Sequence, residues 1–330
     1  MIAYLIGALT LGAITAILVM GLNVRWGWSG DLDLAYYVFV ALAAYFGAVL
    51  QLPPSHGLHG TWILGWNWPF PLGVIGGMVV AAGASAIVGA VALRRLRAEY
   101  LAITTVAFTL VMTAVLSQQS TWFNGFDGVY GLQMPLQNTL NLDPQTYSLL
   151  FLAFCCAIVL ALYFVLEALY KSPFGRTLRT IRENQVAAAA FGRNVYAGKL
   201  KAYVIGGVCA GLGGVLLAQW IGNWNPYTWS TSETFLLYTG IFVGGQANNR
   251  GIMIGTLLAL VFIPQLVLFM PTIPGHGDLW PAMQSVVSGI LIILVLRFRP
   301  QGILREPKFR DKAGDESSPQ AMQLTPRSES

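Results

Sequence analysis

Residues 147–170 read YSLLFLAFCCAIVLALYFVLEALY, and Glu167 is the only charged side chain in this stretch. The hydrocarbon core of a bilayer is about 30 Å thick, so a helix that spans it needs about 20 largely apolar residues. The stretch meets this requirement. It therefore predicts a transmembrane helix, with Glu167 one turn from its end.

Apolar stretches of similar length recur along the chain, and the overall composition agrees with them. Hydrophobic residues make up 55% of the chain and charged residues 10%, whereas soluble domains carry about 25% charged residues. We therefore predict an all-α, polytopic integral membrane protein with about nine transmembrane helices, in a range of about eight to ten. The further predicted spans are residues 2–24, 33–51, 69–93, 99–117, 201–222, 233–249, 251–270 and 281–298.

Two regions of this pattern allow different interpretations. The first span, MIAYLIGALTLGAITAILVMGLNV, lacks the positively charged start of a cleaved signal peptide, so we expect a spanning helix there. The segments on either side of Arg250 contain glycines that weaken helix propensity. They are expected either to span or to form a re-entrant or broken element.

The basic residues fall in alternate connections between the predicted spans. If the connection from Lys171 to Lys201 lies inside, alternation places all 19 Lys and Arg residues on that side. Connections rich in Lys and Arg stay in the cytoplasm. The N-terminus is therefore expected outside and the C-terminus in the cytoplasm. The connections on the outer side contain no Lys or Arg and lie near residues 52–68, 118–146, 223–232 and 271–280.

The inside connection over residues 171–201 is too charged to span a membrane. Ser172 followed by Pro173 is typical of a helix start, and Gly192 of a helix end. This pattern predicts one helix of about 18 residues between them.

The predicted helix is amphipathic and should lie on the cytoplasmic surface. Its apolar residues recur at helical spacing on one face, at Phe174, Leu178, Ile181 and Ala188, and another face carries Arg176, Arg179 and Glu183. Two interpretations stay open. The helix is either held at the interface by anionic lipid or docks onto a soluble partner protein.

Several kinds of functional site are not expected. No phosphate-binding loop of the G-x-x-x-x-G-K-[ST] type occurs, since Gly198-Lys199 is followed by Leu200. The chain is therefore not expected to hydrolyse ATP by that route. Its three histidines are scattered, and the sequence shows no paired carboxylates and no Ser-His-Asp order, so no enzyme activity, cofactor or metal is expected. Nucleic-acid binding needs basic residues gathered on a water-exposed face. It is not expected here, because the basic residues lie between apolar segments.

The inside connection also carries a family resemblance. From residue 172 to 207 it reads SPFGRTLRTIRENQVAAAAFGRNVYAGKLKAYVIGG and resembles the cytoplasmic coupling loop of branched-chain amino acid ABC transporter permeases. The similarity is to the longer of the two paralogous permeases that pair in those systems. Further blocks agree in order: GLNVRWGWSGDLDL (21–34), LRRLRAEYLAITTVAF (93–108), NGFDGVYGLQMP (124–135), GGQANNRGIMIG (244–255) and RFRPQGIL (297–304).

The resemblance implies the permease subunit of an ABC importer that moves branched-chain or related amino acids by alternating access, driven by partner ATPases. It implies a paralogous permease as heterodimer partner, two cytoplasmic ABC ATPase subunits, an extracytoplasmic solute-binding protein, and surrounding membrane lipid. The implied location is the bacterial plasma (inner) membrane. Carried over by position, the ATPase contact consists of Pro173, Phe174, Gly175, Arg176, Arg179, Arg182, Glu183, Ala187, Ala188 and Gly192. Gly175 is expected to allow the partner a close approach.

Departures from the family pattern keep other solutes open. They lie near the predicted pathway, so urea, short amides, other amino acids and other small polar solutes stay alternatives. The departing residues are Leu34, Ala35, Tyr36 and Leu110, together with the unusual charges of Asp31 and Asp33.

Two other classes of protein are weighed against an ABC permease. An ion-coupled secondary transporter usually hides ionisable residues at mid-span, whereas Glu167 lies one turn from the inner end of its span. A membrane-embedded structural or interaction protein would move no solute at all.

Polar residues inside apolar helices are the candidates for the solute pathway. Each could instead bond to a nearby backbone carbonyl or to a packed neighbour. The candidates are Asn23, Thr104, Thr105, Thr109, Thr113 and Gln265.

The chain divides into one large unit and a short tail. Residues 1–305 are assigned to the transmembrane permease domain, with the coupling loop at 171–201. Residues 306–330 are polar and mixed in charge, and are predicted to form a disordered cytoplasmic tail.

The charge sorting makes a prediction about topology. Single cysteines introduced at positions 57, 126, 227 and 276 should react with an impermeant thiol reagent applied outside sealed cells, and those at 96, 186 and 310 should not. Labelling of position 186 from outside would contradict the predicted orientation.

Overall fold

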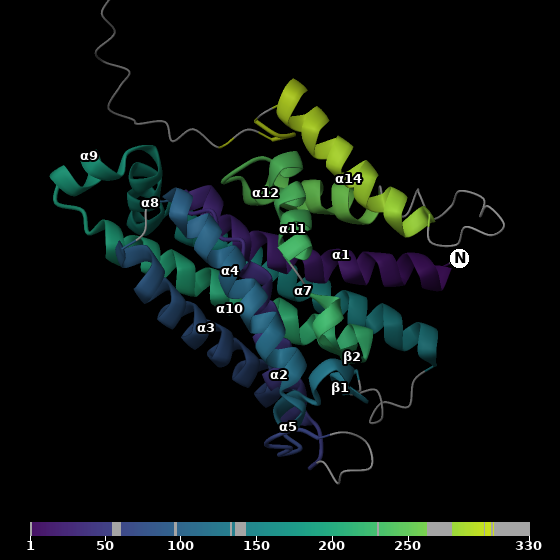
Figure 1. Cartoon of the computed structure of the whole chain (residues 1–330). Helices are drawn as coiled ribbons and strands as arrows, with labels where there is room; N and C mark the ends of the chain where they lie inside the picture. The colour runs from purple at the N-terminus through teal and green to yellow at the C-terminus, as the bar shows by residue number, and fades with distance from the viewer. Residues whose placement is uncertain are drawn as a thin grey trace, which may run out of the picture.

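The computed structural model describes residues 2–54, 61–95, 98–132, 134–135, 143–229, 231–262, 279–299, 301–304 and 306. Most of this part of the chain is helical (Figure 1). The longer helices are α1 (Ile2–Asn23), α3 (Phe70–Arg95), α4 (Ala98–Gln118), α7 (Pro144–Lys171), α10 (Val195–Ile221) and α14 (Leu279–Phe298). The shorter ones are α2 (Tyr36–Gln51), α5 (Ser120–Phe123), α8 (Pro173–Glu183), α9 (Gln185–Ala190), α11 (Thr231–Gly244) and α12 (Asn249–Thr256). The π-helical turns η1 (Val24–Trp28) and η4 (Leu257–Phe262) continue α1 and α12, and β1 (Val129–Tyr130) pairs antiparallel with β2 (Asn223–Trp224).

Five helical segments of the described chain are long and apolar enough to cross a membrane. In those of α3, α4 and α7 fewer than a third of the residues are buried, and such exposed apolar helices would be costly in water and are expected next to lipid. The nearly all-α, multi-span fold is thus confirmed, while the predicted number of spans and the orientation stay predictions. The five segments are Ala3–Trp28, Phe70–Arg94, Tyr100–Gln118, Pro144–Lys171 and Val195–Ile221.

Some helix boundaries differ from the predicted ones. α2 starts at Tyr36 rather than at residue 33, because the preceding backbone N–H groups donate to side chains: that of Leu34 to Thr105 of α4, and that of Ala35 to Asp33 of the same connection. α10 starts at Val195 rather than at residue 201, and the Asn194 side chain caps it by accepting from the Ala197 N–H at 2.9 Å. The predicted span 251–270 is described only to residue 262, where a short helix and a π-helical turn form it.

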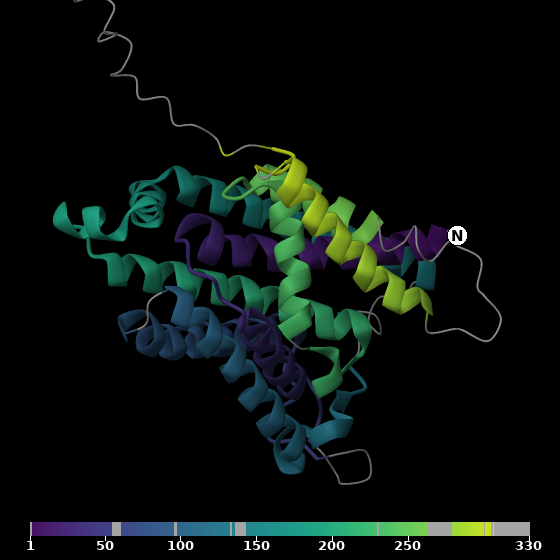
Figure 2. The same ribbon diagram turned by 45° about the horizontal axis from the view of Figure 1, so that its top comes forward.

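α10 is the central helix of the bundle. It packs against α1, α2 and α3, and Figure 2 shows it lying between α1 and α3. Small residues recur four apart on α10 and let these backbones approach closely. Gly207 faces Ser85 and Gly211 faces Met78, both on α3, while Gly214 faces the Val40 carbonyl of α2.

The predicted inner and outer connections lie at opposite ends of the bundle. Figure 1 shows α8 and α9 at one end and α5, β1 and β2 at the other. Described parts of three predicted outer loops meet at that second end, where Val129 pairs with Trp224 and Trp62 forms a bridge with Phe123. This arrangement agrees with the sorting of the basic residues.

The packing of α10 predicts a difference between two glycines. A Cβ at Gly211 would lie 2.6 Å from the Met78 Cα, whereas a Cβ at Gly83 of α3 would have no neighbour within 4 Å. Overpacking costs about 1–3 kcal/mol. Gly211→Ala should therefore lower the thermal unfolding midpoint in detergent, followed by tryptophan fluorescence. Gly83→Ala, with the same gain in helix propensity, should not, and equal midpoints would contradict the close packing.

Candidate functional site

The predicted inside helix is a pair of helices. Ser172 caps α8 by accepting from the Phe174 N–H at 3.2 Å, and Gly192 ends the pair with a positive φ of 74°. The expectation of one continuous helix is wrong, because the chain is extended at Asn184. The Asn184 side chain accepts from the Ala187 N–H at 3.0 Å and so starts α9. We call α8, α9 and the turn to Gly192 the docking hairpin, after the partner contact that is predicted from the sequence.

The inner face of α8 packs on the helix bundle. Leu178 and Ile181 are buried and lie over Gly198 of α10. Gly175 is buried as well, and a Cβ there would overlap the Tyr170 carbonyl oxygen at the end of α7. The small size of Gly175 thus serves the contact between α8 and α7, so a bulky residue at this position would disturb the fold before it reached any partner.

The residues carried over as an ATPase contact divide between the surface and the interior. The partner contact itself stays a prediction. The exposed ones are Pro173, Arg176, Glu183 and Gly192, and the half-buried ones are Phe174, Arg179, Arg182 and Ala187. Gly175 and Ala188 are buried.

The docking hairpin ends in an exposed apolar surface that the sequence analysis missed. Val186 is 80% exposed and Phe191 is 83% exposed, and Ala189 and Ala190 beside them are also exposed. We call these four residues the apolar tip. No periodic signal in the sequence identifies Val186 and Phe191, because the break at Asn184 interrupts the helical register of α8.

Two arginines of α8, Arg179 and Arg182, contact other segments of the same chain. Arg182 binds both carboxylate oxygens of Glu306 from Nη2, at 2.9 and 2.7 Å, and its Nη1 donates to the Gly27 carbonyl of η1. Arg179 bonds to Glu183 at 3.2 Å and lies 3.6 Å from Glu306. The Tyr170 hydroxyl donates to Glu306 at 2.7 Å. Glu306, the first residue of the predicted tail, is therefore bound to α8, and residues 307–330 lie outside the described part.

Close to α8, three charged side chains between α1 and α2 are buried together with one from α10. Arg25 pairs with Asp33, and both side chains are fully buried. Lys199 of α10 pairs with Asp31, and these two are almost fully buried. We call these four residues the buried charge cluster. Burial raises the pKa of the Asp31 carboxyl, while the Lys199 ammonium group acts in the opposite direction.

Neighbouring helices complete the surroundings of Arg25. Its Nη2 donates to the Ser85 hydroxyl of α3 at 2.8 Å. Its guanidinium carbon lies 3.9 Å from the ring centre of Tyr203 and 4.5 Å from that of Phe39, which are cation–π distances. The arginine thus joins η1, α2, α3 and α10 at one point.

Most predicted pathway residues are bonded within the chain. The Asn23 side chain accepts from the Ala247 N–H at 3.1 Å and donates to Asn249 at 3.3 Å, which joins α1 to the α11–α12 connection. The Thr105 hydroxyl accepts from the Leu34 N–H at 3.1 Å. The hydroxyls of Thr104, Thr105, Thr109 and Thr113 each donate to a carbonyl of their own helix. Gln265 lies outside the described residues.

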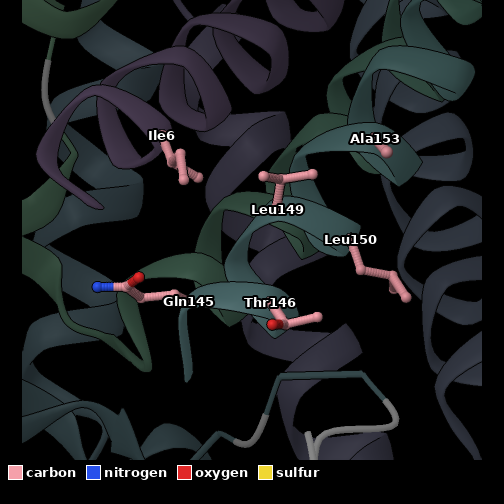
Figure 3. Close-up of a pocket in the computed structure, with 6 residues that line it drawn as sticks. All are labelled: Ile6, Gln145, Thr146, Leu149, Leu150 and Ala153. Carbon is pink, nitrogen blue, oxygen red and sulfur yellow. The ribbon is translucent and has the colours of Figure 1, made fainter. Parts of the chain in front are cut away.

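The described surface contains cavities, among them the following two. The first, of about 430 Å³, lies between the N-terminal parts of α1 and α7, where Figure 3 shows Ile6 across from Leu149 and the polar Gln145 and Thr146 at the helix start. The second, of about 530 Å³, lies beside α8 and contains Lys201 among apolar side chains. In the part of the chain that the structure describes, no His, Cys, Asp and Glu side chains group as a metal site.

Comparisons with known proteins identify what the chain is similar to. Residues 4–296 match the family described as branched-chain amino acid transport system / permease component. The chain is 29% identical to the high-affinity branched-chain amino acid transport system permease protein LivM of Escherichia coli strain K12, over 94% of this chain and 73% of that protein. It is 27% identical to the probable LivM of Methanocaldococcus jannaschii, over 88% and 90%. It is 23% identical to LivH of Escherichia coli strain K12, over 91% and 94%. No solved structure matches it significantly.

The buried charge cluster predicts a stability difference between a single and a double variant. Removing one partner of a buried ion pair costs about 3–5 kcal/mol, because the other charge stays buried without compensation. Lys199→Met should therefore lower the unfolding midpoint in detergent at pH 7, and adding Asp31→Asn should restore at least half of the loss.

Lys201→Met is the matched control, since Lys201 is exposed on the same helix and should tolerate the change. A midpoint for Lys199→Met equal to that of the control would show that the pair is not buried in the folded protein.

Proposed function

The chain belongs to the family of branched-chain amino acid transport system permease components, and from this we propose that it is the transmembrane permease subunit of an ABC importer. The observation that carries the proposal is the docking hairpin. Its inner face is fixed to the helix bundle, and its apolar tip is open to a partner. The proposed partner is a cytoplasmic ABC ATPase, which supplies the energy because the sequence has no phosphate-binding loop.

A protein partner accounts for the apolar tip better than lipid does. An interfacial helix turns its apolar face toward the membrane, but the apolar face of α8 is already used, since Leu178 and Ile181 pack on α10. Figure 1 shows α9 projecting past the ends of the neighbouring helices. Large exposed apolar groups in such a place are typical of a protein–protein interface.

The proposed mechanism is alternating access. Closure of the two ATPase subunits would move the docking hairpin and reorient the helices around the solute. The largely exposed faces of α3, α4 and α7 leave room for lipid and for a paralogous permease subunit as the heterodimer partner. The similarity to both LivM and LivH proteins supports a pair of permeases. A separate extracytoplasmic binding protein would deliver the solute.

The proposed solute is a branched-chain or related amino acid, with urea and short amides as alternatives. An ion-coupled carrier is the other alternative. Against it, Glu167 forms an ion pair with Lys171 at 3.0 Å and accepts from Asn249 at 3.3 Å, so its carboxylate is bound at the end of α7 that carries the docking hairpin. The proposed location is the bacterial plasma (inner) membrane, where the chain would be a multi-pass protein.

The apolar tip predicts the outcome of a copurification experiment. Replacing Val186 and Phe191 by Ser should reduce the ABC ATPase that copurifies with the tagged permease at least tenfold and abolish ATP-dependent leucine uptake into vesicles. The variant should insert at normal levels, because both side chains are exposed and contribute little to the fold.

Phe298→Ser is the control, because Phe298 is 76% exposed at the end of α14 and outside the docking hairpin. Copurification of no ABC ATPase with the unaltered permease would contradict the proposed function itself. Undiminished copurification with the Val186/Phe191 variant would exclude the apolar tip as the docking surface.

A further inference from the structure

Arg182 holds two segments that lie far from it in the sequence. One guanidinium nitrogen donates to the Gly27 carbonyl in η1, and the other binds the carboxylate of Glu306. The planar guanidinium group can make both contacts at once, because its donors point in fixed and different directions. Arg182 thus connects the docking hairpin directly to the end of α1.

The Gly27 end of this connection is tightly packed. A Cβ at Gly27 would overlap the Asn23 side chain and lie 2.9 Å from the Ala247 nitrogen, so η1 rests against the α11–α12 connection. Asn23 itself bonds to Ala247 and Asn249. A displacement of Gly27 therefore requires the inner ends of α1 and α12 to move with it.

The same turn leads into the buried charge cluster. The Ser29 hydroxyl donates to the Arg25 carbonyl and lies 3.0 Å from an Asp31 oxygen. Arg25 pairs with Asp33, and Asp31 pairs with Lys199 on α10. Densely packed and hydrogen-bonded groups transmit displacement rather than absorbing it. A movement of Gly27 would therefore reach α3 and α10 as well as α1.

We propose that Arg182 is a positioning residue that transmits movement of the docking hairpin to the transmembrane helices through the Gly27 carbonyl. This inference rests on the proposed function. Glu306 has a secondary role, in which its carboxylate orients the guanidinium group and joins it to Arg179 and Tyr170. The competing interpretation is that Arg182 only anchors the segment around Glu306.

The test compares variants at the two ends of the Arg182 contact. Arg182→Lys keeps a positive charge for Glu306, but its donors all sit on one nitrogen and cannot reproduce two donor nitrogens held apart in one plane. Arg182→Gln removes the charge as well. Glu306→Gln removes the ion pair, keeps a side-chain oxygen that can accept a hydrogen bond, and leaves the donor to Gly27 in place. Arg94→Gln is the control, because Arg94 is exposed at the end of α3 and outside the docking hairpin.

The first readout is the ATP hydrolysed per leucine imported by the complete importer in proteoliposomes. Both Arg182 variants should raise this ratio at least tenfold while copurifying ATPase stays within twofold of the unaltered complex. Glu306→Gln should raise it less than threefold, and Arg94→Gln should leave it unchanged. If Glu306→Gln uncouples as strongly as Arg182→Gln, Arg182 is an anchor and the proposal is overturned.

The second readout needs no transported solute. Deuterium uptake over residues 24–35 is compared between the nucleotide-free complex and the complex trapped with ATP and vanadate. The difference seen in the unaltered complex should persist in Arg94→Gln and disappear in Arg182→Gln. If the difference in deuterium uptake persists in Arg182→Gln, the proposal is overturned. Loss of ATPase copurification in Arg182→Gln would overturn it as well, because Arg182 would then be a docking contact. Failure of the unaltered permease to bind an ATPase concerns only the proposed function.

Discussion

The ion pair between Arg25 and Asp33 is the constraint on which the helix packing near α8 depends. Both side chains are fully buried, and removing such ions from water costs several kcal/mol each. The cost is offset only when every partner is in place, including the Ser85 hydroxyl and the rings of Tyr203 and Phe39. Because these partners belong to different helices, the pair specifies one arrangement of α1, α2, α3 and α10 rather than adding much net stability.

The irregular connection that carries this pair also attaches more distant helices. Its backbone groups are not satisfied by a helix, so they bond to side chains that approach from other elements. The Tyr238 hydroxyl of α11 bonds to the backbone of Asp33 at 3.1 Å, and the Thr105 hydroxyl of α4 accepts from the Leu34 N–H. Thr234 of α11 accepts from the Tyr37 N–H at 3.3 Å. The connection between α1 and α2, which carries the buried charges, is thus the point where α4 and α11 contact the core.

Local sequence signals were sufficient to predict much of the fold, but they did not predict contacts between residues that are distant in the sequence. The apolar spans, the cap at Ser172 and the stop at Gly192 follow from short stretches of sequence, and the structure confirms the two helix ends. The break at Asn184 was missed because the alanines after it favour a continuous helix. In addition, a polar residue inside a helical pattern does not reveal whether its side chain caps a new helix. Asp31 and Asp33 stood out as unusual charges, but the pairing of Asp31 with Lys199, 168 residues away, leaves no periodic pattern. For the same reason the ion pairs of Arg179 and Arg182 with Glu306 could not be predicted from the sequence.

The two faces of the docking hairpin have opposite physical character, and this contrast bears on how it could work. On the inside, Leu178 and Ile181 are buried and Arg182 is bound at two points, so α8 cannot shift without moving the groups beneath it. On the outside, Val186 and Phe191 lose exposed apolar area when a partner covers them, which is favourable at about 25 cal/mol per Å² and needs no exact geometry. A non-directional contact tolerates the sliding of a partner surface, whereas the directional bonds inside fix distance and angle. If a partner binds the apolar tip, the binding energy can therefore be converted into a defined displacement only at the inner face, where the hydrogen-bonded Arg182 lies.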